Sequence, residues 1–150
     1  MNTGLEEWES TGGEVDETYF FALFAEAYLK KGDSKAGAEV LQKALDAAER
    51  RGERFYLSEL HRLKGECLLL APVRGESEVE RCFQLAITIA GEQSAKSLEL
   101  RAATSLASLR NEQGKSIEAR NILADMYDKF SQGLDAVDLK AAKKLIDELT

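Results

Sequence analysis

His61 is the only histidine in this sequence of 150 residues, and imidazole is the side chain most often used for proton transfer and metal binding. A metal site or a catalytic triad needs further groups at a fixed spacing, such as a second histidine, a nearby cysteine or a carboxylate. His61 lacks such a set of partners. We therefore expect a structural histidine, and we expect neither a bound metal ion nor a catalytic residue.

Cys67 and Cys82 are the only cysteines, and both fall within apolar stretches with helical spacing. They could approach each other across a helical hairpin and form a redox pair, but cysteines on apolar helix faces usually pack in the core. Two thiols are too few for the disulfide framework of a small secreted protein. The sequence therefore favours core packing and a reducing, cytoplasmic location.

Acidic side chains are abundant, with 27 Asp and Glu against 20 Lys and Arg. General acid–base catalysis needs a pair of carboxylates held in an apolar pocket with shifted pKa values, whereas these carboxylates fall on polar helix faces. Gly12 and Gly13 follow no strand and precede no lysine at the spacing of a phosphate-binding loop. We expect neither enzymatic activity nor a cofactor.

The formal net charge of −7 argues against nucleic acid as a partner, because a polyanion is bound by clustered lysines and arginines. The longest basic runs are pairs at 30–31, 50–51 and 143–144, and each lies near an expected helix end, where cations complement the helix dipole. No apolar run approaches the ~20 residues that span a bilayer. The sequence therefore predicts a soluble protein without membrane contact.

Helices must position all of these side chains, because apolar residues recur at intervals of three and four along the chain. Three ranges each hold two such stretches and are predicted to be helical hairpins: about 16–50, 53–91 and 95–131. The first helix would end before Gly32, Asp33 and Ser34, and the second would begin there with a polar cap. Two features recur at a period of about 41 residues: a glycine at the turn and an inward position on the helix that follows it. They fall at Gly32 and Ala44, at Gly75 and Ala86, and at Gly114 and Met126.

The two ends of the chain differ in pattern. The range 135–149 has one apolar and one charged face, as expected of a helix that ends an open stack in water, and Asp135 or Asp138 could cap it. Residues 1–13 read as the remnant of a preceding repeat or as an N-terminal extension, which leaves 14–150 as one all-α domain. Uncovered phenylalanines at this end would make self-association possible: Phe20, Phe21 and Phe24.

In the first hairpin, small and large apolar residues fall at Ala25, Tyr28, Gly32, Gly37, Leu41 and Ala44, a pattern that resembles the tetratricopeptide repeat. The stretches YFFALFAEAYLKKG (19–32) and GERFYLSELHRLKGECLLL (52–70) are further similar to the C-terminal repeat region of bacterial signalling proteins that contain a STAND-type ATPase. The resemblance implies a right-handed α-α superhelix of three hairpins and a capping helix. It also implies that the chain is the sensor or partner-binding arm of a nucleotide cyclase or transcription regulator.

In such a superhelix the first helix of each hairpin lines a concave groove. The resemblance places eight candidate binding residues there: Tyr19, Glu26, Glu59, Arg62, Glu66, Arg101, Ser108 and Asn111. Arg62 and Arg101 could bind a carboxylate or phosphate on a peptide or small effector. Alternatively, both pair with carboxylates of the chain itself, namely Glu59, Glu66 or Glu99.

These patterns together predict a non-enzymatic domain that binds a protein or peptide, with other domains of its parent protein among the candidates. Two further functions stay open from the sequence. The groove could sense a small-molecule effector directly, or the N-terminal end could pair two copies as a homodimer.

Overall fold

The computed structural model describes residues 17–52, 54–71, 75–130 and 136–149. This part of the chain contains seven helices and no strand, which confirms the expected all-α class. The helices are α2 (Glu17–Lys30), α3 (Ser34–Arg51), α4 (Leu57–Leu70), α5 (Glu76–Glu92), α6 (Lys96–Glu112), α7 (Ser116–Phe130) and α8 (Ala136–Glu148). Among them, none is both long enough and apolar enough to cross a membrane. The range 1–13, including Gly12 and Gly13, and the possible cap Asp135 lie outside the described residues.

Both ends of α3 are specified by local chemistry. Asp33 precedes the helix, and its Oδ1 accepts a hydrogen bond of 3.1 Å from the backbone N–H of Ala36, which satisfies one of the donors that a helix start leaves free. Gly52 follows the helix with φ of 62°, a left-handed conformation that glycine adopts without a Cβ penalty. The length of α3 is therefore set by residues at its own ends.

The turns inside the hairpins are not all built alike. Gly32 and Gly114 have φ of 78° and 80° and lie between the two helices of the first and third hairpins. Gly75, predicted to be their counterpart, instead has φ of −95° and immediately precedes α5. The connection between α4 and α5 is longer than the other two, so its reversal does not depend on a left-handed conformation at Gly75.

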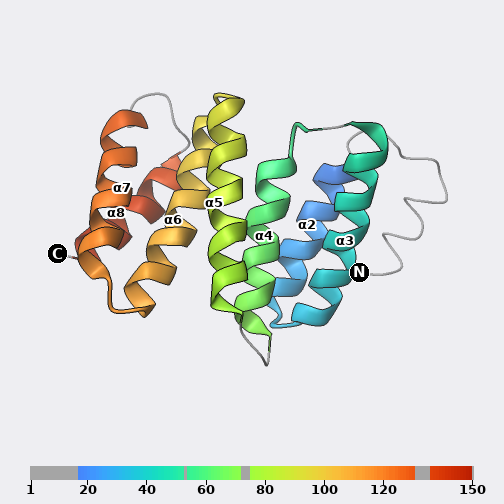
Figure 1. Cartoon of the computed structure of the whole chain (residues 1–150), viewed down its shortest axis with the longest axis horizontal. Coiled ribbons are helices and arrows are strands. Elements are labelled where there is room, and N and C mark those ends of the chain that lie inside the picture. The colour runs from blue at the N-terminus through green and yellow to red at the C-terminus, as the bar shows by residue number, and fades with distance from the viewer. Residues whose placement is uncertain (1–16, 53, 72–74, 131–135, 150) are drawn as a thin grey trace.

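The helices pack in a regular order, visible as a row in Figure 1. Each hairpin pairs its own two helices, and the second helix of each hairpin contacts the first helix of the next. In addition, α2 contacts α4, α4 contacts α6, and α6 contacts α8, whereas within the described ranges α3, α5 and α7 make no such contact with one another. One side of the molecule is thus formed by four helices that touch in sequence, and the other by three helices that are held apart.

The hydrophobic core is divided into three clusters along this row. The first joins α2, α3 and α4 around Phe21, Leu41 and Leu60. The second cluster contains Val79 and Phe83 of α5 and two leucines of α6. The third cluster joins α6, α7 and α8. Each cluster consists of helices that are neighbours in the chain, so stability comes mainly from contacts between adjacent helices.

The first helix leaves part of its apolar surface in solvent. Phe21, Ala22 and Ala25 of α2 are buried, whereas the phenyl ring of Phe20 and the side chain of Leu23 are each more than one third exposed. Of the three phenylalanines expected to be uncovered, Phe20 is exposed, Phe24 is partly buried and Phe21 is fully buried. No other described helix covers this outer face of α2, because its contacts are with α3 and α4.

Gly65 of α4 packs closely against α5 within the second hairpin. A Cβ atom at this position would lie 2.5 Å and 2.9 Å from two ring carbons of Phe83, whose side chain is fully buried. Packing against α5 therefore favours glycine here, because a Cβ atom would overlap a buried aromatic ring in a closely packed interior and force it to shift.

Candidate functional site

Two adjoining hollows follow the side of the molecule formed by α2, α4, α6 and α8. The first has a volume of about 440 Å³ and is lined by Glu26, Leu29, Lys30, Arg62, Leu63, Glu66, Leu69, Leu70 and Glu112. The second has a volume of about 270 Å³ and is lined by Arg62, Glu66, Arg101, Thr104, Ser105, Ser108, Asp138 and Ala141. Because Arg62 and Glu66 line both hollows, we treat these residues together as one groove.

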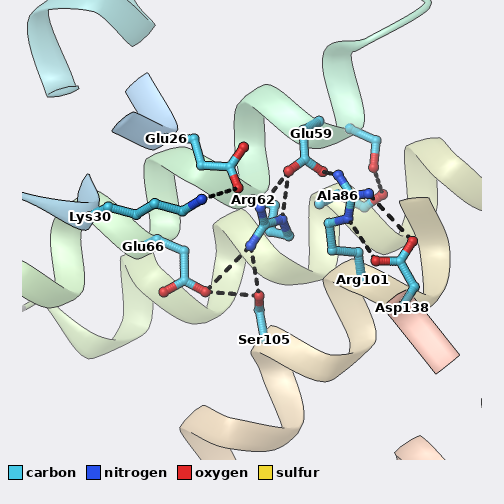
Figure 2. A network of polar contacts seen from close by, with 10 residues as sticks. Glu26, Lys30, Glu59, Arg62, Glu66, Ala86, Arg101, Ser105 and Asp138 are labelled. Atoms are coloured by element: carbon cyan, nitrogen blue, oxygen red, sulfur yellow. Dashed lines mark hydrogen bonds and ion pairs between the residues drawn. The ribbon is translucent and has the colours of Figure 1, made fainter. Parts of the chain in front are cut away.

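Glu59 lies beneath the groove and holds Arg62 in place. Its carboxylate is only 3% exposed, and its Oε1 accepts a hydrogen bond of 2.9 Å from Nε of Arg62 and a second, shorter one from Nη2. Arg62 is itself 13% exposed. A carboxylate and a guanidinium that share two hydrogen bonds in a poorly solvated site form a strong pair, so Arg62 is fixed from below (Figure 2).

Arg101 connects the same carboxylate to the last helix. Its Nη1 lies 3.3 Å from Oε2 of Glu59, and its Nε and Nη2 donate to the two carboxylate oxygens of Asp138 at 3.4 Å each. Burial disfavours the charged guanidinium, but the carboxylates of Glu59 and Asp138 outweigh burial and raise the pKa of Arg101. Arg101 therefore stays charged and tied to α4 and α8.

Ser105 of α6 completes the network on the other side of Arg62. Its hydroxyl donates to Oε1 of Glu66 at 2.8 Å and accepts from Nη1 of Arg62 at 3.4 Å. Nη1 of Arg62 is also 3.7 Å from the Glu66 carboxylate. As Figure 2 shows, the polar contacts run without interruption from Glu66 to Asp138 across α4, α6 and α8.

Neither a protein-family model nor a curated protein matches this chain. The groove and the network beneath it therefore carry the functional argument. Within the described ranges, no group of three or more His, Cys, Asp or Glu side chains is arranged to hold a metal ion.

The groove brings together most of the binding residues that were predicted from the sequence. Glu26, Arg62 and Glu66 line the first hollow, and Arg101 and Ser108 line the second. The ion-paired alternative for the two arginines is the arrangement observed, with Glu59 and Glu66 as partners of Arg62. An anion that bound these arginines would have to compete with a carboxylate that is already buried against them.

Three of the eight predicted residues do not line either hollow. Glu59 lies below them, as described above. Tyr19 packs edge-to-face against Tyr56, with ring centroids 5.5 Å apart, and Asn111 is exposed near the end of α6. Tyr19 and Asn111 are therefore placed to contact only a partner that extends beyond the two hollows.

Several lining residues were not predicted. Asp138 was expected only as a helix cap, and nothing in its local sequence indicates a pairing with Arg101 of α6. Ser105 and Glu112 were also missed, although their helical spacing from Arg101 and Ser108 places them near the predicted stripe. A third hollow of about 630 Å³ was missed entirely. It shares no lining residue with the other two and is lined by Phe55, Tyr56, Gln93, Ala95, Lys96, Ser97 and Leu98.

Both cysteine thiols are buried and free. Burial, assisted by the charge of Glu66, raises the pKa of Cys67 to about 11, and burial also raises the pKa of Cys82. Because the thiolate is the reactive form, neither sulfur is activated for chemistry at neutral pH. Their position inside the core agrees with the packing role that the sequence favoured.

We expect His61 to make the stability of the protein depend on pH. Partial burial, with a smaller contribution from the charge of Lys64, lowers its pKa below the ordinary value of 6.5. The unfolded chain therefore binds a proton at higher pH than the folded chain does, and stability decreases as the pH falls below about 6.5. We expect the free energy of unfolding to decrease between about pH 7.5 and pH 5.5, measured by urea denaturation.

The variant His61→Gln supplies the control for this pH dependence. It removes the only imidazole in the chain and should give a flatter profile over the same range. An equal slope in both proteins would show that another group causes the effect.

Proposed function

We propose that this chain is a non-enzymatic binding domain that accepts a segment of another protein in the groove between α2, α4, α6 and α8. The observation that carries this proposal is the one-sided packing of the helices. Four helices that touch in sequence present their side chains along one continuous surface, and that surface contains both hollows. Stacked helical hairpins commonly use such a surface to bind extended partners.

We further propose that the helices form a right-handed superhelix of the tetratricopeptide type, and that the chain serves as a sensor or partner-binding arm of a larger bacterial STAND-type ATPase. The alternating contacts between helices and the division of the core into successive clusters support this architecture. The sequence similarities at 19–32 and 52–70 support the assignment to signalling proteins. A ligand that prefers one arrangement of the arm would then shift the parent protein between resting and active states.

A small-molecule effector is the second candidate ligand of the same groove. The volume of the first hollow, about 440 Å³, lies within the range of roughly 300–1,000 Å³ that is common for small-molecule sites. A thermal-shift screen with metabolites distinguishes the two candidates, because a ligand that binds only the folded state raises the melting temperature.

Random peptides displayed on phage and selected on the full chain test the proposal. We expect the selected peptides to bind the variant Leu70→Ala about tenfold more weakly than the unchanged chain, a loss of about 1.4 kcal/mol. Leu70 lines the first hollow and is 50% exposed, so its truncation removes contact area with little effect on the core.

Two matched variants serve as controls for this selection. Ile117→Ala removes an exposed aliphatic side chain from α7, outside the groove, and Phe55→Ala alters the third hollow. Both should retain binding. Peptides that bind Leu70→Ala normally and lose affinity for either control would place the binding site elsewhere and overturn the proposal.

A further inference from the structure

The first hollow combines apolar and acidic side chains. Four leucines contribute to its lining, and so do three carboxylates, which we call its rim: Glu26, Glu66 and Glu112. The two cations at this hollow are Lys30 and Arg62. Lys30 lies 3.8 Å from Glu26 on an exposed part of α2, and Arg62 is bound to Glu59 and Glu66.

Negative charge exceeds positive charge over the whole groove. The second hollow adds one cation, Arg101, and one acid, Asp138, and the buried Glu59 lies under both arginines. Oε2 of Glu59 accepts no hydrogen bond from the part of the chain that the structure describes, although Nη1 of Arg101 is 3.3 Å away. Among the described residues, five carboxylates therefore lie in or beneath the groove, against three cations.

The arginines cannot easily turn toward an incoming anion. Releasing Arg62 would leave the Glu59 carboxylate buried without its main partner, and an unpaired buried charge is strongly unfavourable. A carboxylate or phosphate in the groove would also meet the surrounding glutamates at close range. A cationic ligand, in contrast, is attracted by the excess of carboxylates and can share Glu26 and Glu66 with the groups that already contact them.

We propose that the groove binds a protein segment that places a lysine or arginine beside an apolar side chain. The apolar side chain occupies the leucine-lined hollow, and the cation lies against Glu66, Glu26 and Glu112 at its rim. This inference rests on the proposed function and names the chemical class of its partner.

An array of short synthetic peptides of random sequence, incubated with the full chain at low salt, tests the inference. We expect the retained peptides to be enriched in lysine or arginine next to Leu, Ile, Met or Phe. Replacing that cation by citrulline or norleucine in the strongest peptides should weaken binding about tenfold, and high salt should weaken it as well.

Paired variants of the protein locate the charge effect. The double variant Glu26→Gln with Glu112→Gln should weaken binding of the cationic peptides about tenfold. The matched control, Glu39→Gln with Glu49→Gln, removes the same charge from exposed positions of α3 and should change affinity less than twofold.

The possible outcomes separate this inference from the proposed function. The inference of a cationic partner is wrong if the retained peptides are acidic or neutral. It is also wrong if their binding is insensitive to the citrulline replacement and to the rim variants. If those same peptides still lose affinity for Leu70→Ala, the groove remains the binding site. If no peptide is retained, or if Leu70→Ala has no effect, both proposals fail.

Discussion

Replacing Glu59 with glutamine is expected to lower the free energy of unfolding by roughly 3 kcal/mol, the lower end of the range for removing one partner of a buried ion pair. Glutamine keeps the size of the side chain but removes the charge that holds Arg62 from below and Arg101 from the side. Both arginines retain a second carboxylate, which is why the upper end of that range is not expected. Urea denaturation of the two proteins measures the difference.

The variant Glu66→Gln provides a matched control for this effect. Glu66 belongs to the same network and also contacts Arg62, but its side chain is 34% exposed, so water can replace the lost interaction. Its loss should cost less than about 1 kcal/mol. Equal effects from the two variants would show that the buried position of Glu59 contributes nothing special to stability.

The variant Gly65→Ala should lower the free energy of unfolding by about 1–2 kcal/mol, although alanine is the better helix former. The added Cβ would lie 2.5 Å from a ring carbon of the buried Phe83, and overpacking of this kind costs roughly 1–3 kcal/mol. The helix preference of alanine over glycine returns only about 0.5–1 kcal/mol. Chemical denaturation gives the net change directly.

A second substitution isolates the clash as the cause. Adding Phe83→Leu to Gly65→Ala removes the ring. The loss in the free energy of unfolding of the double variant should therefore be about 1 kcal/mol smaller than the two single losses added together. Gly91→Ala in α5 is the control, because its Cβ would meet only the flexible carboxylate of Glu99, at 3.5 Å. It should stabilise the protein by about 0.5–1 kcal/mol. A stabilising Gly65→Ala would contradict the packing argument.

Features that depend on neighbouring residues could be predicted from the sequence. The helices follow from apolar residues at intervals of three and four, and the start of α3 follows from the side chain of Asp33, which acts on its own helix. The exposure of the phenylalanines of α2 was predicted less well, because Phe20 and Phe21 are both large and apolar. Only contacts with α3 and α4 decide that Phe21 is buried and Phe20 is partly exposed.

The network under the groove shows the same division between local and distant information. Arg62 and Glu66 are four residues apart on one helix, so their pairing is a local feature that spacing can indicate. The contacts of Arg101 with Glu59 and Asp138 join residues on different helices and depend on how those helices are placed. The sequence contains no periodic signal for such a contact, which is why Asp138 was expected only as a cap.

The three-part core has a consequence for how the length of this protein can change. Each cluster is assembled from helices that are neighbours in the chain, so insertion or deletion of a whole hairpin would alter only the clusters next to the change and would leave a more distant cluster intact. Evolution can therefore extend or shorten the proposed binding surface in steps of one hairpin, with changes to the interior confined to the neighbouring clusters.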